Sequence, residues 1–536
     1  MSEKRSLLRS AGAVSAATLI SRILGLVREM VQAYFFGAGM LVDAFTAAFR
    51  IPNLLRDLFA EGALSSAFVP TFTAERELRG QEAAWRLGNR ILTALAIVLG
   101  GLAVLIAAFA PAILRVYVPG FTPEKMALAA TMTRILSAFL AFVALAAVAM
   151  GMLNTCGRFF VPALAPAWFN VAAIGGVLGL VPLFRTIGIP PIHSLAVGAM
   201  AGGMLQFLVQ VPALRREGFR FRPEVAFSDP GVRRVAKLML PATFGLAATQ
   251  INILVDTILA SSYGDGPIAW LQYAFRLILL PIGLFGVALA TANLARVSRD
   301  AARGDTEAMR GNLASSLRAA ALLTLPASAG LVALREPIVR ILFEHGRFGP
   351  ADTEMTSAAL LCYALGLYAY SVTKIQVPTY YALGDTRRPV AASAIAVAIK
   401  IAANFALLAL LPRFGIAAFL GLALSTSLAA WTNFAILQRG LARRIGGLRE
   451  HGVVRATVGV AALSVGMGAA SGLLHAWLER SLAGGGIAGE IGRLAVAVAA
   501  GVAIFGAGAL ALRIPEARMI AERLAALAPR RGGRRP

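Results

Sequence analysis

The sequence predicts an all-α integral membrane protein with 14 transmembrane helices, arranged as two pseudo-symmetric six-helix lobes plus two C-terminal helices. Three observations predict this fold class: an apolar composition, apolar stretches of membrane-spanning length along the whole chain, and a repeat between its two halves. Of the 536 residues, 58% are hydrophobic and 15% are charged, whereas about a quarter of the residues in an ordinary globular protein are charged. This composition excludes a cytosolic enzyme, a secreted disulfide scaffold and a disordered tail.

The candidate spans follow from the length of apolar sequence that crosses a bilayer, about 20 residues for a core of roughly 30 Å. They cover residues 11–36, 42–72, 88–112, 129–152, 159–182, 192–214, 235–262, 267–295, 314–334, 356–380, 391–411, 415–438, 454–475 and 491–512. The basic start of the chain resembles a signal peptide. Arg22 and Arg28 interrupt the apolar stretch that follows, however, and no small-residue cleavage site is present, so we expect a retained first helix.

The net charge of +24 indicates the orientation of the chain, because cytoplasmic loops of membrane proteins collect Lys and Arg. With an even number of spans and a cytoplasmic N-terminus, most of the 51 Lys and Arg residues fall on the cytoplasmic side. The main clusters are Arg215, Arg216, Arg220, Arg222, Arg233, Arg234 and Lys237; Arg439, Arg443, Arg444, Arg449 and Arg455; and Arg530, Arg531, Arg534 and Arg535. Membrane orientation and attraction to anionic lipids explain these clusters better than binding of nucleic acid does. We therefore expect membrane lipids as partners, no nucleic acid, and both termini in the cytoplasm.

An internal repeat divides the chain into lobes. Residues 48–59 (AFRIPNLLRDLF) align without gaps to residues 274–285 (AFRLILLPIGLF) with six identities, and each segment lies in the second span of a six-span block. Two homologous lobes are a common plan of transporters that bind their substrate between the repeats. We expect an N-terminal lobe over 1–214, a C-terminal lobe over 215–438, and an appendix over 439–536 with spans 13 and 14 and a basic tail.

Arginines inside the spans are the main candidates for a functional site, because each costs roughly 2.5–3.5 kcal/mol at a helix centre. These residues are Arg22, Arg28, Arg50, Arg56 and Arg276. A planar guanidinium donates two parallel hydrogen bonds to a phosphate and stays charged in a low dielectric. The set therefore favours an anionic ligand such as a diphosphate. The alternative is that the arginines snorkel to the membrane surface or form structural pairs with acids.

The acids near these arginines are too few to pair with all of them. They are Asp43, Asp57 and Glu61, and Asp43 stands close to the membrane surface. We expect them to tune the charge of the arginines or to act in gating. Gly25 and Pro52 lie between the arginines of the first two spans, and such residues bend or open a helix. We expect local opening there to add backbone amides to the site.

The second lobe carries a different set of polar residues. Asp256 lies in the middle of span 7, Lys400 and Asn404 share one face of span 11, and Thr426 lies between two serines in span 12. This set predicts either a cation site with Asp256 as the charged ligand or an ion pair between Asp256 and Lys400 that responds to protons. A buried pair with a purely structural role is the alternative.

Catalysis and bound cofactors find no support in the sequence. No GxxxxGK[ST] nucleotide-binding loop occurs, and no soluble stretch is long enough for an ATPase domain. The four histidines lack metal-site spacing, and the two cysteines lie too far apart for a metal motif. An enzyme acting on polyprenyl diphosphates would need an acidic metal cluster or a nucleophile with a general base. We expect a transporter driven by a gradient, by the membrane potential or by its substrate's own gradient.

Several motifs resemble the MurJ (MviN) lipid II flippases, a family of the multidrug/oligosaccharidyl-lipid/polysaccharide exporter superfamily. The resemblance is most specific in SRILGLVRE at 21–29 and in FGAGMLVDAFTAAFRIPNLLRDLFAEGALSSAFVPTF at 36–72. It continues through GMLNTCGRFFVPALAP at 151–166, YAFRLILLPIGLFGVALAT at 273–291 and TYYALGDTRRPV at 379–390, and it covers essentially the whole chain.

The resemblance implies a two-lobed bundle of 14 helices in the bacterial cytoplasmic (inner) membrane. It would move the undecaprenyl-diphosphate-linked peptidoglycan precursor from the inner to the outer leaflet by alternating access, with the cell-wall synthesis machinery as a partner. By motif, Arg22, Arg28, Arg56 and Arg276 would bind the diphosphate, and Asp43 would matter to the cycle. Spans 13 and 14 would form a groove for the lipid tail.

The same resemblance suggests sodium coupling through Asp256, Asn404 and Thr426. Lys400 departs from the pattern, because its ammonium could take the place of the ion. Proton coupling stays open beside it. Rival functions are export of drugs or of other polyprenyl-linked oligosaccharides, and a scaffold that binds the precursor without transporting it. A drug exporter for cations would line its cavity with acids, whereas arginines predominate here.

Overall fold

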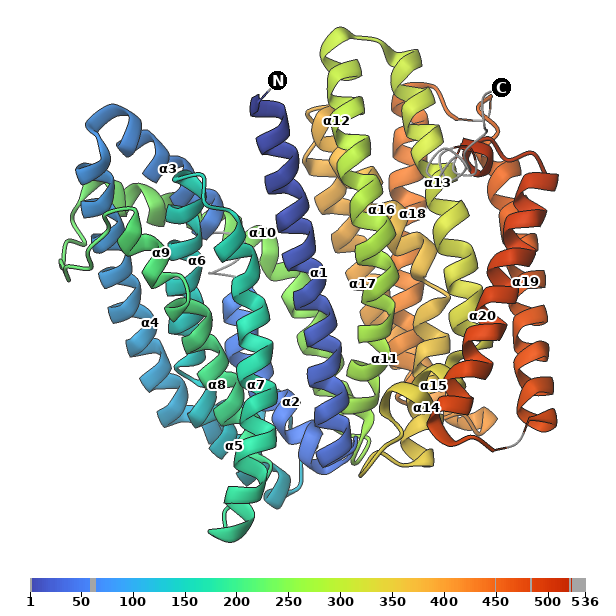
Figure 1. The fold of residues 1–536 in the computed structure, drawn as a ribbon, viewed down its shortest axis with the longest axis horizontal. Helices are drawn as coiled ribbons and strands as arrows, with labels where there is room; N and C mark the ends of the chain where they lie inside the picture. The colour runs from blue at the N-terminus through green and yellow to red at the C-terminus, as the bar shows by residue number, and fades with distance from the viewer. Residues whose placement is uncertain (1, 58–63, 449, 483, 520–521, 523–536) are drawn as a thin grey trace, which may run out of the picture. The chain divides into compact units, whose positions relative to one another are not determined.

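The computed structural model describes residues 2–57, 64–448, 450–482, 484–519 and 522 (Figure 1). All regular elements in this part of the chain are helical. Packing divides the chain into two compact units: unit 1 comprises Met1–Ala269 and His345–Gly349, and unit 2 comprises Trp270–Glu344 and Pro350–Pro536. The all-helical prediction is therefore confirmed for the described residues.

In the described part of unit 1 there are ten α-helices and the start of an eleventh. They are α1 (Ser2–Phe36), α2 (Met40–Arg56), α3 (Leu64–Arg79), α4 (Gln81–Tyr117), α5 (Pro123–Leu136), α6 (Phe139–Thr155), α7 (Phe160–Thr186), α8 (His193–Leu208), α9 (Val211–Arg216) and α10 (Pro230–Ala260), with α11 (Pro267–Pro281) beginning at the end of the unit. The core of unit 1 lies where α3, α4 and α6 meet, around Phe68, Phe72 and Phe139.

Unit 2 continues α11 through a short π-helix. Its elements are η2 (Ile282–Gly286), α12 (Val287–Arg303), α13 (Thr306–Ala333), α14 (Arg335–Phe343), α15 (Pro350–Ala364), α16 (Leu367–Ala382), α17 (Arg387–Leu410), the 3-10 helix η3 (Leu411–Phe414), α18 (Leu420–Ile445), α19 (Val453–Ser481) and α20 (Gly486–Ala511). The two C-terminal helices α19 and α20 pack against each other and against α13 (Figure 1).

Local sequence explains where several helices begin. Thr122 and Asp229 precede Pro123 and Pro230 at the starts of α5 and α10, and proline suits the first helical position because its missing N–H has no partner there anyway. The Asp229 carboxylate accepts hydrogen bonds from two free backbone amides, including that of Gly231 at 2.9 Å. These start signals set the ends of two helices that position the residues described below.

Small residues allow a close helix contact in unit 1. A Cβ atom at Gly176 of α7 would lie 2.6 Å from the Cα of Gly198 in α8. Such contacts between glycines are a common way for membrane helices to pack, because apolar burial gives no driving force between helices inside lipid.

Helices of membrane-spanning length and composition run through both units. Within the described residues, ten helical segments are long and apolar enough to cross a bilayer, and α15 with α16, bent by 43°, makes an eleventh if the two count as one span. The three further predicted spans, 11–36, 42–72 and 235–262, coincide with α1, with α2 and α3, and with α10. These helices are not among the segments that meet the requirement of length and apolar composition for a membrane span. The structure thus supports the membrane class and leaves the count of 14 spans to the proposal below.

Candidate functional site

The two arginines of α1 differ in their surroundings. Arg28 is largely buried, with 20% of its side chain exposed; its Nη2 lies 3.3 Å from Oε1 of Glu29, and its guanidinium lies 5.4 Å from the ring centre of Phe169 in α7. Arg22 is exposed, and no ion pair joins it to a described residue. The surroundings of Arg28 hold its side chain in place, whereas no described residue engages the hydrogen-bond donors of Arg22.

The helices around these arginines stay closed. α1 is continuous through Gly25, and α2 continues through Pro52 to Arg56. The expected local opening at these two residues is therefore wrong for this structure. The chemistry available at the site comes from side chains rather than from released backbone amides.

A chain of polar contacts begins at the end of α2. Nε and Nη2 of Arg56 lie 3.2 and 2.8 Å from Oδ1 of Asp57, and Oδ2 of Asp57 accepts a hydrogen bond of 3.2 Å from Nε2 of Gln250 in α10. Arg50, one turn and a half earlier, is half-buried. Glu61 lies outside the described residues. The alternative interpretation of the sequence was that these arginines form ion pairs with acids. Such pairs are present for Arg56 and for Arg28.

Asp43 at the start of α2 is the most enclosed acid of the predicted set. Its side chain is fully buried, and its two oxygens accept three hydrogen bonds of 2.8 Å. The donors are Nζ of Lys125 at the start of α5 and the backbone amides of Gly266 and Ala269, in the connection from α10 to α11. The prediction that Asp43 lies near the membrane surface stays untested, but its contacts with the ends of three helices are clear.

Lys125 completes this cluster and was missed by sequence reasoning. Its Nζ also lies 2.9 Å from Oδ1 of Asp265 and 3.2 Å from the carbonyl oxygen of Gly264, and it lies over the ring of Phe121 at 4.4 Å. Burying a charge costs several kcal/mol unless it is paired and hydrogen-bonded. Both conditions are met here. The available signal was that Lys125 lies in the predicted loop between spans 3 and 4 and Asp265 in the predicted loop between spans 7 and 8, on the same side of the membrane.

The polar residues of unit 2 partly come together. Lys400 and Asn404 are both buried on one face of α17, and the Ser425 hydroxyl of α18 donates to Oδ1 of Asn404. Thr426 instead donates to the carbonyl oxygen of Leu422 at 2.7 Å within its own helix. Arg276 is half-buried in α11 of this unit, whereas Asp256 belongs to α10 of unit 1.

A metal site of ordinary composition is not formed by the described residues. They contain no group of three or more His, Cys, Asp or Glu side chains placed to hold a metal ion. Cys156 and Cys362 are both free thiols. Burial raises the pKa of the Cys156 thiol, which lies just after α6, and this disfavours the reactive thiolate. The chemistry that the site offers is therefore charge recognition by arginines and a buried lysine.

Comparison with known proteins places most of the chain beside one group. Residues 32–485 match the family model described as lipid II flippase MurJ. The chain is 38% identical over 447 residues to a probable lipid II flippase MurJ of Vibrio cholerae, covering 82% of this chain and 83% of that protein. It is 37% identical over 445 residues to the lipid II flippase MurJ of Burkholderia cenocepacia, covering 82% and 84%.

Solved structures agree with these relatives. A structure of a lipid II flippase MurJ in an inward closed conformation matches with a TM-score of 0.74 and 27% identity, covering 93% of this chain and 99% of that one. An inward-facing multidrug transporter of the MATE family, from the MOP superfamily, matches with a TM-score of 0.62 and 15% identity over 82% of this chain and 99% of its own. At that identity the second likeness concerns the fold alone.

Proposed function

The chain belongs to the MurJ family of lipid II flippases, and on this premise we propose how its own residues perform the activity of that family. The protein is a lipid II flippase and a transporter. It carries the undecaprenyl-diphosphate-linked peptidoglycan precursor from the inner to the outer leaflet by alternating access. The match to a relative along more than four fifths of both chains carries this conclusion.

Arg22, Arg28, Arg56 and Arg276 are proposed to bind the diphosphate, with Arg50 supporting the positive field. The side chains of unit 1 support the first two assignments. Arg22 has no carboxylate partner among the described residues, and Arg28 is held by Phe169 and Glu29. A guanidinium held in place loses less freedom on binding, so its bidentate hydrogen bonds to phosphate become stronger.

Asp57 and Glu61 are proposed to tune these arginines and to help close a gate. Asp57 already engages Arg56 while Gln250 holds its second oxygen. Since both side chains of the Arg56–Asp57 pair are about a quarter exposed, the pair is weak enough for an arriving diphosphate to replace the carboxylate. In this scheme the acid keeps Arg56 oriented until the substrate binds.

Asp43, Lys125 and Asp265 are proposed to form a latch at the outer end of the translocation path. The latch joins the starts of α2 and α5 to the connection that leads into α11. Because a buried ion pair loses its hydrogen bonds when its helices separate, opening requires Asp43 and Lys125 to be hydrated together, whereas Asp265 is already 53% exposed. Such a cluster favours two discrete states, closed and open, which alternating access needs.

The proposed orientation is supported by the same contacts together with the charge distribution. The latch requires the starts of spans 2 and 4 and the end of span 7 to lie on one side of the membrane, as the 14-span arrangement predicts for the outer side. Arg90 pairs with Glu224 at 2.6 Å, near two span ends predicted to be cytoplasmic. We propose 14 spans, lobes over 1–214 and 215–438, a lipid-tail groove and basic tail over 439–536, and both termini in the cytoplasm. The location is the bacterial inner membrane, where the cell-wall synthesis machinery would receive the product.

For the coupling ion, we propose that Lys400 supplies the positive charge that a sodium ion supplies in sodium-coupled relatives. Its burial beside the Asn404–Ser425 hydrogen bond supports this proposal. Asp256 would then form an ion pair with Lys400 or take up a proton, and it would not bind sodium. Thr426 would keep its intrahelical hydrogen bond.

Depletion of the protein in its native host tests the function. Lipid II at the outer leaflet is followed with a periplasmic enzyme that cleaves only the translocated precursor. Exposure should fall while total lipid II accumulates, and a wild-type copy should restore exposure where an Arg28→Ala copy does not. Persistent exposure in a host without a second flippase would mean that the fold is assigned correctly and that the proposed cargo is wrong. Oligosaccharide lipids would then be the next cargo to test.

A further inference from the structure

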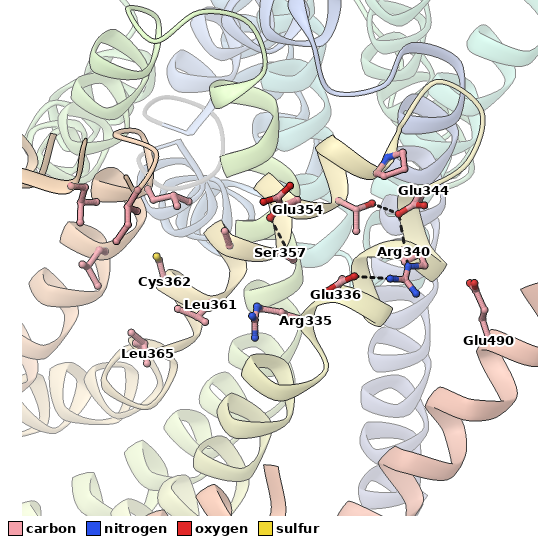
Figure 2. A pocket seen from close by; sticks show the side chains of 17 residues that line it. Arg335, Glu336, Arg340, Glu344, Glu354, Ser357, Leu361, Cys362, Leu365 and Glu490 are labelled. Atoms are coloured by element: carbon pink, nitrogen blue, oxygen red, sulfur yellow. Dashed lines mark hydrogen bonds and ion pairs between the residues drawn. The ribbon is translucent and has the colours of Figure 1, made fainter. Parts of the chain in front are cut away.

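A cavity of about 1040 Å³ lies inside unit 2, and none of its lining residues belongs to the proposed diphosphate site or latch (Figure 2). It is bounded by α14, α15, the connection from α17 to α18, and the start of α20. Arg335, Pro350 and Leu420 are the first residues of their helices. In the 14-span arrangement proposed above, these residues lie at span ends, and this places the cavity close to the lipid headgroups. Its volume is about that of a ligand site.

One wall of the cavity is apolar. It is formed by Leu361, Leu365, Leu411, Ile416, Leu420 and Leu424. Leu365 and Ile416 expose 48% and 43% of their surface. In a protein embedded in lipid, an exposed apolar wall next to headgroup depth is open to acyl chains.

The remaining lining is largely ionic, and its charges are incompletely paired. The charge of Arg340 is already paired, since its guanidinium nitrogens lie 2.6 Å from a carboxylate oxygen of Glu336 and 2.7 Å from one of Glu479. Within the described parts of the chain, Arg335 donates only to the carbonyl oxygen of Val332, at 2.8 Å. Among the described residues, neither Glu354 nor Glu490 has an ion pair within 4.0 Å. Arg335 and Glu490 project from different helices, α14 and α20 (Figure 2).

The balance of charge around the cavity is unusual for this chain. Its lining holds two arginines and four glutamates, although the whole protein has a net charge of +24. A purely anionic ligand would satisfy Arg335 and leave the glutamates repelled. A metal ion is disfavoured because the described residues form no group of three acids placed to bind one. The ligand that complements the lining carries both a phosphate and a cation.

We propose that this cavity binds a phospholipid with a primary ammonium headgroup, of the phosphatidylethanolamine class. The phosphate binds Arg335, the ammonium donates to Glu354 and Glu490, and an acyl chain covers the apolar wall around Leu361 and Leu365. A primary ammonium suits the glutamates because it has three N–H donors, whereas the quaternary ammonium of phosphatidylcholine has none. The proposal requires only that the protein is embedded in lipid, so it can fail while the flippase function stands.

Native mass spectrometry of the purified full-length protein tests the proposal. The protein is delipidated and offered equal amounts of phosphatidylethanolamine, phosphatidylglycerol and phosphatidylcholine. Phosphatidylethanolamine should be retained in preference to the other two. Arg335→Gln should weaken its retention about tenfold, the factor expected when one charge-assisted hydrogen bond is lost. The double variant Glu354→Gln, Glu490→Gln should abolish the preference over phosphatidylcholine.

Arg413→Gln is the matched control, because Arg413 is an exposed arginine of η3 that does not line the cavity. An equal loss in this variant would show adventitious surrounding lipid and overturn the proposal. Equal or tighter retention of phosphatidylglycerol would overturn it in favour of a simple phosphate site. If Arg335→Gln fails to fold, the double glutamate variant decides the matter, and an unchanged lipid preference there refutes the ammonium contact.

Discussion

Nζ of Lys125 lies 2.8 Å from Oδ2 of Asp43, and both side chains are almost completely excluded from solvent. The two residues are 82 positions apart. Each is indispensable to the other, because either charge left alone in this place would have to be neutralised or hydrated. The pair therefore holds the starts of α2 and α5 together as long as the cluster stays closed.

Replacing Lys125 by Met should lower the free energy of unfolding by about 3–5 kcal/mol, since it strands the buried Asp43 carboxylate. Thermal unfolding of the purified protein measures this loss. Adding Asp43→Asn should recover part of it, because the double variant leaves no unpaired charge. Lys237→Met, at an exposed lysine of α10, serves as control. A double variant no more stable than Lys125→Met would argue against the pair.

The latch also predicts an effect on transport that is separate from stability. In the Asp43→Asn, Lys125→Met variant the outer end opens without breaking an ion pair, so the outward-open state should become more populated. Labelling of single cysteines introduced near residues 43 and 265 by an impermeant thiol reagent reports this opening. Unchanged labelling in a well-folded double variant would mean that the cluster is structural only.

Replacing Arg22, Arg28 or Arg276 by Ala should abolish lipid II transport while membrane insertion persists. The reason is that each change removes a bidentate phosphate donor. Arg28→Lys should also fail, because a lysine ammonium cannot make the same two parallel bonds. Arg185→Ala, at an exposed position at the end of α7, should behave as wild type. Normal cell-wall synthesis in all three alanine variants would refute the assignment of the diphosphate site.

Asp57→Asn should change stability by no more than about 1 kcal/mol, because partly exposed ion pairs contribute little. Any loss of transport in this variant would then report the orientation of Arg56 rather than the fold. The matched change is Gln250→Glu, which places a second acid beside Asp57 and should raise the cost of the closed arrangement. Thermal unfolding and the lipid II exposure assay, run side by side, separate the two effects.

Transport should not depend on sodium if Lys400 supplies the charge in unit 2. Replacing sodium by potassium in reconstituted vesicles should leave the transport rate unchanged. Lys400→Gln removes the ammonium beside Asn404 and Ser425 and is the variant most suited to gain sodium dependence. Saturable stimulation of the wild type by sodium would refute the proposal.

Much of the fold was predictable from the sequence, because hydropathy is a local property that adds up along a helix. The spans around residues 88–112 and 454–475 needed only the length of apolar sequence. The helix starts at Pro123 and Pro230 are equally local. The family also followed from contiguous motifs such as SRILGLVRE at 21–29.

The pairing of charges was decided only by the tertiary structure. Arg28 and Arg56 find acids at neighbouring positions, yet the sequence allowed them to be either free or paired. Asp43 depends on an amide 223 residues away. Such contacts depend on which helices pack together and at what height, and no local pattern contains that information.

By itself, then, the sequence determined that this chain is a helical membrane protein of the lipid II flippase family with arginines inside its spans. The tertiary structure decided which of those charges are held by partners, that Lys125 is the buried partner of Asp43, and that unit 2 contains an amphipathic cavity. The physical reason is that transfer of a helix into lipid is governed by its own composition. A buried charge, in contrast, is stable only where the rest of the chain brings a partner to it.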